Sequence, residues 1–243
     1  MNKIFRYELR RLIWNKYFIG LLVINCIYAW YILTTETIAG VAYTAPFSLW
    51  SFGAYLACVL PFSIITVLFL ISVYYSKKER QVEVLTMVTP MNKAHYALVR
   101  NGAIAVCFLI ICSIMFLMGI YFYSSYFDYE KVVLYLLPFI MLVFPCLLFT
   151  LGIGHLAGRI HQGLLYVLMV IVLVLGFANS GNFDFFGGWY FGSYPLSLPI
   201  GIEGEPAFTV SSGFLAARLI YLTAGVILLT IGISAGQQKA RKA

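Results

Sequence analysis

The chain has 243 residues, of which 62% are apolar and only 10% are charged, and its mean hydropathy is +0.92. Soluble domains are about 45–50% apolar and about 25% charged, so the composition excludes a water-soluble enzyme or binding domain. An aromatic fraction of 17% at low charge also excludes a disordered chain. What remains is an integral membrane protein. At about 20 residues per helix, the length allows roughly six spans and no large soluble domain.

We predict an all-α polytopic domain that covers residues 1–243, with six spans joined by mostly short connections. The predicted spans are residues 18–35, 52–75, 96–123, 132–157, 163–178 and 214–236. The fifth span is short, and Pro61 predicts a kink in the second.

The first 17 residues, MNKIFRYELRRLIWNKY, predict an amphipathic helix that lies in the membrane interface. On a helical wheel the apolar face comprises Phe5, Leu9, Leu12, Ile13 and Tyr17. The residues mostly opposite are Lys3, Glu8, Arg10, Arg11 and Asn15. Arg6 and Lys16 fall on the apolar side, so a short cytoplasmic segment with stop-transfer charges is the alternative. We expect no cleavable signal peptide, because the segment is highly charged and no small-residue cleavage site follows.

The basic residues predict the topology. Fourteen of the 16 Lys and Arg residues fall in segments on one side of the predicted spans, and only Lys131 and Arg218 fall on the other. Cytoplasmic loops carry such an excess, so we expect both termini and residues 76–95 in the cytoplasm. The outer side then holds residues 36–51, 124–131 and 179–213. The net charge of +7 reflects this topology, and we expect a multi-pass protein of a bacterial inner or plasma membrane without a nucleic-acid partner.

Residues 76–95 are the most polar stretch and predict a short amphipathic helix in a cytoplasmic loop. Val82, Leu85 and Val88 recur at i, i+3 and i+6, and Pro90 ends the helix. The charged residues around this stripe are Lys77, Lys78, Glu79, Arg80 and Glu83. Such a helix can fill an apolar groove on a soluble partner while its charges set the register. A solvated loop that carries topological charges is the alternative.

Residues 179–213 hold seven glycines, three prolines and many aromatic residues. The segment is too apolar for a solvated loop. We predict that it folds back into the outer leaflet as short helices that plug the path, because irregular backbone at that depth must be satisfied by protein or water.

The acidic residues, the short apolar helix and the turn Thr89-Pro90-Met91-Asn92-Lys93 resemble the first cytoplasmic loop of type-2 ATP-binding-cassette (ABC-2) export permeases. The N-terminal amphipathic helix and the six-span layout with both ends inside are also similar to that family. So is the segment before the last span, where the family places short re-entrant helices. The resemblance covers the whole chain in layout and about 20 residues in motif, and Val82 stands where many members have glycine.

The resemblance implies a permease subunit that forms the translocation path and converts the motion of a separate ATPase into export. It implies two ATPase subunits that bind ATP and Mg, and a second permease subunit, identical or paralogous. The residues that would couple this chain to the ATPase are Glu79, Arg80, Glu83, Leu85, Val88 and Pro90. The cargo would be a peptide, an antibiotic or a lipid-like amphipathic compound. The chain has no GxxxxGK[ST] motif, so we expect no cofactor in this chain and no enzymatic activity of its own.

Other patterns in the sequence give weaker evidence about function. The histidines form no metal-ligand pair, the cysteines form no CxxC pair, and no serine or aspartate pattern predicts an intramembrane protease. Asn25 lies in the middle of the first span, where its amide needs an interhelical partner. Arg218 lies inside the last span. It either snorkels outward, which we favour, or pairs with Asp184, Glu203 or Glu205. An ATP-independent carrier or channel, and a non-transporting membrane partner or anchor of an ATPase, are the alternative functions.

Overall fold

The computed structural model describes residues 2–76, 79, 81, 93–129, 131–177, 184–201 and 205–241. Within that part of the chain every regular element is helical, which confirms the predicted all-α class. The α-helices are α1 (Asn2–Ile13), α2 (Lys16–Thr35), α3 (Leu49–Tyr74), α5 (Lys93–Phe127), α6 (Leu136–Ile160), α7 (Gln162–Phe177), α8 (Gly188–Gly192) and α9 (Ser212–Arg241). The 3-10 helices are η1 (Thr37–Ala39), η2 (Val132–Tyr135) and η3 (Tyr194–Ser197).

Five helical segments are long and apolar enough to cross a membrane, which confirms a polytopic membrane protein at this level. They are Lys16–Ala39, Leu49–Tyr74, His95–Phe127, Val132–Ile160 and Ser212–Ser234. The helix α7 is also apolar but has only 16 residues. Its length is about 24 Å, against a hydrocarbon core of about 30 Å, so it needs a thinned bilayer or snorkelling flanking residues to cross. The sixth span stays a prediction.

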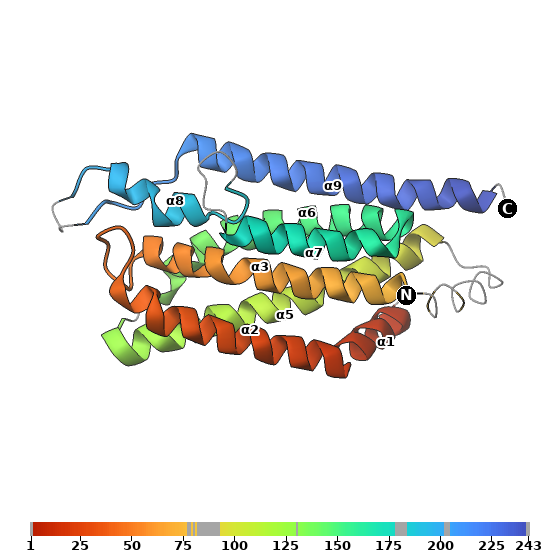
Figure 1. The fold of residues 1–243 in the computed structure, drawn as a ribbon, viewed down its shortest axis with the longest axis horizontal. Helices are drawn as coiled ribbons and strands as arrows, with labels where there is room; N and C mark the ends of the chain where they lie inside the picture. Colours follow the sequence, from red (N-terminus) through yellow and green to blue (C-terminus); the bar gives the residue numbers. More distant parts are fainter. Residues whose placement is uncertain are drawn as a thin grey trace.

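The long helices alternate in direction, so every second connection lies at the same end of the bundle (Figure 1). The two ends differ in charge. We call the end that carries α1 and the last residues of α9 the basic end, and the opposite end the acidic end. The segments at the basic end are α1, the starts of α2 and α5 and the end of α6, and they contain Arg6, Arg10, Arg11, Lys16, Arg100 and Arg159. The segments at the acidic end are the end of α2, the end of α5 and the connections on either side of α8 and η3, and they contain Glu36, Asp128, Asp184 and Glu205. The side of the membrane that each end faces stays a prediction.

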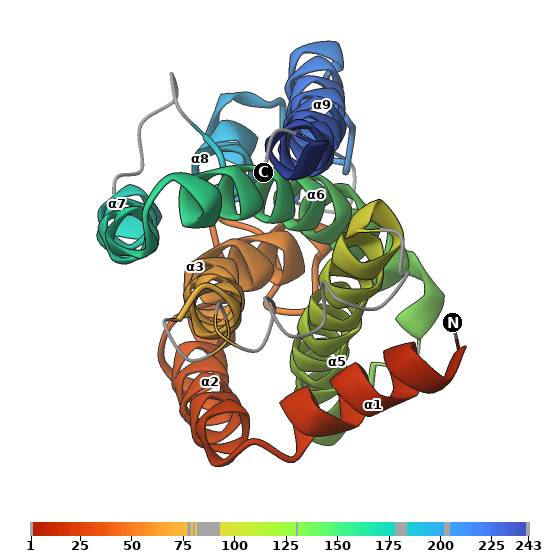
Figure 2. The same ribbon diagram turned by 90° about the vertical axis from the view of Figure 1, so that its right-hand side faces the viewer.

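The helix α3 is the centre of the bundle. It contacts α2, α5, α6, α7 and α8, and 72% of its most apolar segment is buried, against 17% for α9 (Figure 2). The helix α9 lies along α6, where two glycines allow the backbones to approach closely: a Cβ atom added to Gly152 would lie 2.5 Å from the carbonyl oxygen of Gly225. A displacement of α3 would therefore reach most of the bundle directly and α9 mainly through α6.

The outer faces of α2, α7 and α9 are apolar. Ile27 of α2, Val170 of α7 and Ile220 of α9 are each more than 60% exposed. Side chains of this kind on three long helices are stable only in contact with lipid or with another membrane-spanning chain.

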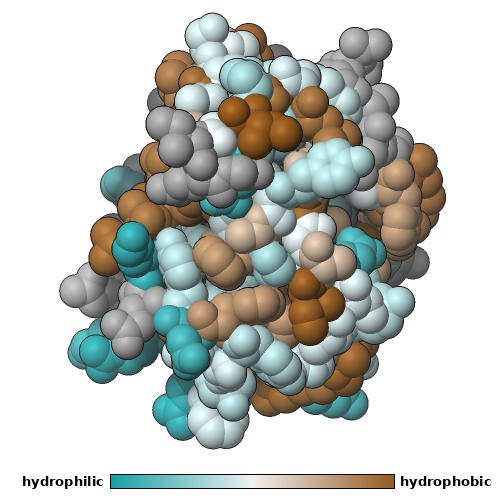
Figure 3. Space-filling view, turned by 90° about the vertical axis from the view of Figure 1, so that its left-hand side faces the viewer, coloured by the Kyte–Doolittle hydropathy of each residue, from teal (hydrophilic) through white to brown (hydrophobic). Residues whose placement is uncertain are grey.

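Two short helices, α8 and η3, cover the start of α3 at the acidic end. Tyr190 and Phe191 of α8 are buried, and a Cβ atom added to Gly53 of α3 would overlap the Phe191 ring. The indole nitrogen of Trp50 donates a hydrogen bond to the carbonyl oxygen of Pro206 at 3.1 Å. Figure 3 shows this end of the molecule, where hydrophilic side chains lie mainly around the edge and pale or hydrophobic ones fill the middle. Short helices are thus present in the described part of residues 179–213, and their insertion into the outer leaflet stays a prediction.

Candidate functional site

A buried carboxylate at the basic end joins three helices. Glu8 of α1 is only 3% exposed. The hydroxyl of Tyr74 donates to Glu8 Oε2 at 3.1 Å, and the hydroxyl of Tyr96 donates to Glu8 Oε1 at 3.2 Å. Tyr74 is the last residue of α3 and Tyr96 lies in the first turn of α5. One carboxylate therefore holds together the two helix ends between which residues 76–92 run.

This position of Glu8 corrects the helical wheel, which placed it on the polar face opposite the apolar residues. The helix α1 packs against α5, and its buried residues include both Glu8 and Leu12. A carboxylate can be buried when hydrogen bonds replace the water that it loses, and here two tyrosine hydroxyls do so. The signal available in the sequence was that Glu8 is the only acidic residue among the first 35.

The same helix also contacts Glu79, one of the predicted coupling residues. The guanidinium of Arg11 donates to both carboxylate oxygens of Glu79, with Nη1 at 3.3 Å from Oε2. Arg11 Nη1 also lies 3.8 Å from Glu8 Oε2. The hydrogen bond to Glu79 raises the pKa of Arg11 above its usual value, so the guanidinium remains charged. Because Arg11 is partly exposed, this pair contributes only about 1 kcal/mol or less to stability.

Of the predicted coupling residues, the structure thus places Glu79 in an ion pair within the chain. The others, which are Arg80, Glu83, Leu85, Val88 and Pro90, lie outside the described residues.

Arg100 completes the network around Glu8. Its guanidinium carbon lies 3.9 Å from the centre of the Tyr74 ring and 5.5 Å from that of Tyr96. Its Nη2 atom donates to the carbonyl oxygen of Tyr74 at 3.1 Å, which satisfies a backbone acceptor at the end of α3. We call Glu8, Arg11, Tyr74, Tyr96 and Arg100 the Glu8 cluster. Analysis of the sequence missed its tyrosines, because nothing in their local pattern distinguishes them from other interfacial aromatic residues.

A second polar contact at the basic end joins α6 to α3 and α5. His155 Nδ1 lies 2.7 Å from the Tyr75 hydroxyl and 3.5 Å from Asn101 Nδ2. The Asn101 amide nitrogen can only donate, so Nδ1 is the acceptor and the imidazole proton is assigned to Nε2. His155 Nε2 is buried without a hydrogen-bond partner among the described residues. It faces α9, where a Cβ atom added to Gly232 would lie 2.7 Å from His155 Cδ2.

Asn25 has the interhelical partners that its position in the sequence predicted. Its Nδ2 atom donates to Thr66 Oγ1 at 3.0 Å and to the carbonyl oxygen of Leu21 at 2.8 Å, and Ser63 Oγ donates to its Oδ1 at 3.2 Å. The amide is 1% exposed. Asn25 therefore fastens α2 to α3, and its hydrogen-bonding groups are occupied by the chain itself.

Arg218 does not snorkel, and it pairs with neither Asp184 nor Glu205, so these interpretations of the sequence are wrong. Glu203, the other predicted partner, lies outside the described residues. It is 3% exposed, and its Nη1 and Nη2 atoms donate to the carbonyl oxygens of Phe185 and Asp184, the latter at 3.0 Å. Its guanidinium carbon lies 4.4 Å from the centre of the Phe214 ring. Arg218 thus holds the turn before α8 against α9.

The carboxylate of Asp184 has a different role. It accepts hydrogen bonds from the backbone nitrogens of Trp189 and Tyr190 at 3.1 and 2.8 Å. These are free amides of the first turn of α8, which a carboxylate stabilises. Asp184 and Arg218 together therefore position the short helix at the acidic end.

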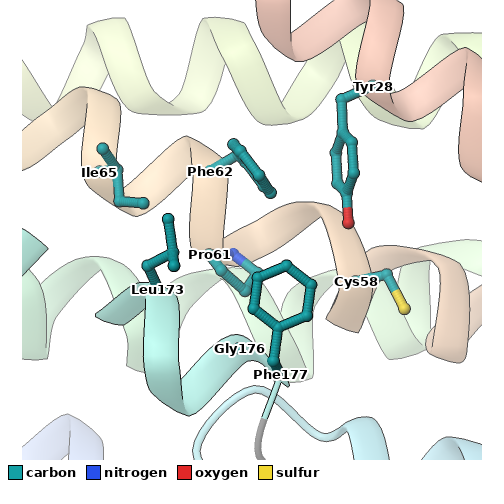
Figure 4. A pocket seen from close by; sticks show the side chains of 8 residues that line it. All are labelled: Tyr28, Cys58, Pro61, Phe62, Ile65, Leu173, Gly176 and Phe177. Atoms are coloured by element: carbon teal, nitrogen blue, oxygen red, sulfur yellow. The ribbon is translucent and has the colours of Figure 1, made fainter. Parts of the chain in front are cut away.

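A small crevice lies between α2, α3 and α7 (Figure 4). It is lined by Tyr28, Cys58, Pro61, Phe62, Ile65, Leu173, Gly176 and Phe177. The space inside is about 10 Å³, which is at the lower limit for one water molecule. This crevice is too small to hold a cargo molecule.

Comparisons of the chain with models of known protein families, with curated protein sequences and with solved structures find no match. The resemblance to ABC-2 permeases therefore rests on the motif and the layout of the helices alone.

Proposed function

We propose that this chain is the membrane-spanning permease subunit of an ABC-2 type exporter. The observation that carries the proposal is the Glu8 cluster together with the pair between Arg11 and Glu79. These contacts attach the start of the predicted coupling segment to α1, and they attach α1 to the end of α3 and the start of α5.

The arrangement supports a mechanism in which force enters through the loop. A load on residues 76–92 acts on α3 and α5 through the backbone and on α1 through Arg11. Because Glu8 binds Tyr74 and Tyr96 at once, the three helices respond together. The central position of α3 then transmits a tilt to α2, α6, α7 and α8. The short helix α8 rests on the far end of α3, so the same tilt would alter the cover of the acidic end.

The partners follow from this role. Two ATPase subunits bind ATP and Mg and dock below the basic end, and a second permease subunit, identical or paralogous, completes the path. The apolar outer faces of α2, α7 and α9 are available to that subunit and to lipid. The cargo class is a peptide, an antibiotic or a lipid-like amphipathic compound, and the basic end faces the cytoplasm.

The first alternative is an ATP-independent carrier or channel. Such proteins place ionisable or free polar groups near the middle of the membrane to bind an ion or substrate. Asn25, the polar residue predicted there, is fully hydrogen-bonded within the chain, which favours the permease. The second alternative is a non-transporting partner of an ATPase. Only a measurement of ATP-dependent flux distinguishes it from a permease.

The test uses copurification of the ATPase and ATP-dependent export for Glu83→Lys and Leu85→Asp, with Asn2→Lys as the control for added charge. Reversal of a charge against a complementary docking surface is expected to weaken association by on the order of a few kcal/mol, while export is lost and insertion is unchanged. A solvated loop would lose under about 0.5 kcal/mol. Full ATPase binding and full export by both loop variants would contradict the proposal.

The orientation is tested separately with a single cysteine at Thr86 in a cysteine-free background. We expect a membrane-impermeant thiol reagent to label this position only after the cells are opened. Labelling in intact cells would reverse the topology and place the coupling segment on the wrong side for a cytoplasmic ATPase.

A further inference from the structure

The helix α1 has two different long faces. The buried face, which includes Phe5, Glu8 and Leu12, is turned toward the bundle. Figure 2 shows α1 lying across the edge of the bundle at the basic end, beside α5 and the start of α2, with its other side open.

The open side carries a regular series of basic and aromatic residues. We call it the outward stripe, and it consists of Lys3, Tyr7, Arg10, Trp14 and Tyr17. Lys3, Tyr7 and Arg10 are three or four residues apart and share one face of α1, which ends at Ile13. Trp14 follows α1 directly, and Tyr17 lies in the first turn of α2, after the extended residue Asn15. Tyr7 is 66% exposed, Trp14 is 76% exposed and Tyr17 is 54% exposed.

The charges of this stripe have no acidic partner within the described part of the chain, where the ion pairs of α1 involve only Arg11. Lys3 and Arg10 are both exposed. Exposed Trp and Tyr rings are favourable where an apolar body meets a wet headgroup layer, and Lys and Arg are attracted to acidic lipid headgroups. Trp14 lies two residues before the start of α2, where the first membrane-crossing segment begins, so the stripe lies at headgroup depth.

We propose that the outward stripe of α1 binds the headgroups of anionic phospholipids in the leaflet at the basic end. Tyr7, Trp14 and Tyr17 insert between headgroups, and Lys3 and Arg10 contact the phosphates and the additional negative charge of the acidic lipid. The sequence predicted an amphipathic helix in the membrane interface. In the structure the apolar residues Phe5, Leu9, Leu12 and Ile13 pack on the bundle. Tyr17, which the helical wheel grouped with them, is exposed, and the side of α1 opposite the packed residues is the one that meets lipid.

The test uses the purified chain alone in nanodiscs, so it does not depend on the proposed ATPase. Two nanodisc preparations are compared, one with brominated phosphatidylglycerol and one with brominated phosphatidylcholine, each at the same mole fraction. Bromine quenches indole fluorescence on contact. The signal of Trp14 is the difference between the parent protein and Trp14→Phe. We expect stronger quenching by the brominated anionic lipid, with a preference that falls as salt is added.

The charge requirement is tested with the double variant Lys3→Gln/Arg10→Gln. Each basic residue near an acidic surface contributes about a fivefold preference, so the double variant should lose on the order of 25-fold. Lys131→Gln is the matched control, because it removes one exposed charge at the acidic end and should leave the Trp14 signal unchanged.

Three outcomes would overturn the inference. Equal quenching by the two brominated lipids in the parent protein would show that the stripe does not select acidic headgroups. An unchanged preference in the double variant would show that Lys3 and Arg10 do not provide it. An absence of any Trp14 quenching would mean that water or a protein, and not lipid, covers this face.

Discussion

Replacement of Glu8 by alanine tests the central contact of the basic end. The change leaves the hydroxyls of Tyr74 and Tyr96 without their acceptor. A buried donor without a partner costs about 1–3 kcal/mol. Tyr74 is 4% exposed and bears this cost in full, whereas Tyr96 is partly exposed and can bond to water. The expected loss for Glu8→Ala is therefore about 2–4 kcal/mol in the free energy of unfolding, with Tyr74 contributing most of it.

The measurement is reversible unfolding of the purified protein in the same detergent or nanodisc for a set of four variants. Tyr74→Phe removes the hydroxyl but keeps the ring on which Arg100 stacks. In that background Glu8→Ala should cost about 1–2 kcal/mol less, because the donor that needed the carboxylate is absent. Glu36→Ala is the control: it removes an exposed acid at the other end and should cost under about 0.5 kcal/mol.

The reasoning is refuted if Glu8→Ala and Glu36→Ala destabilise the protein equally, or if the loss for Glu8→Ala is the same with and without the Tyr74 hydroxyl. Either result would mean that the carboxylate is not the acceptor that holds α1 to α3. If the proposed function is also correct, Glu8→Ala should reduce ATP-dependent export more than it reduces copurification of the ATPase, because it weakens transmission and leaves the docking segment intact.

Three further variants address contacts inside the bundle. Asn25→Leu should cost only about 0.5–1.5 kcal/mol in unfolding, because the hydroxyls that it leaves behind also donate to carbonyls of their own helix; a loss of export without a loss of stability would instead indicate a role in the path. Arg218→Met should speed hydrogen exchange of residues 184–192, which the arginine holds against α9, with Arg218→Lys intermediate; unchanged exchange would show that the turn needs no clamp. Gly53→Ala should cost about 1–3 kcal/mol, because its methyl group overlaps the Phe191 ring, and Phe191→Leu should restore part of that loss; a silent Gly53→Ala would contradict the packing of α8 on α3.

Much of the candidate site could not be predicted because its members are distant in the sequence. Glu8 lies 66 residues from Tyr74 and 88 from Tyr96, and a helical wheel ranks faces by polarity without knowing what will meet them. Once α5 supplies a hydroxyl at the right place, a carboxylate can lie on the buried face. The sequence also could not show which groups lie beside Arg218. Snorkelling is favourable only if no hydrogen-bond acceptor lies closer to the guanidinium than the membrane surface. The turn before α8 provides two carbonyl oxygens, and these decide the direction of the side chain.

The sequence by itself determined three properties: that lipid surrounds most of the protein, which segments are helical, and which connections between helices are basic. A mean hydropathy of +0.92 leaves lipid as the main surroundings, long apolar runs must be helical because a bilayer offers no partner for free backbone groups, and Lys and Arg gather at one set of connections. The ends of α1, α2, α3, α5, α6, α7 and α9 lie within five residues of the predicted segments, because apolar length is a local property. Only the tertiary structure decided which helix is central, which face of α1 meets the protein and which polar groups are already paired. Those outcomes depend on hydrogen-bond partners from other helices, because a buried polar group loses its water and is stabilised when such a partner replaces it.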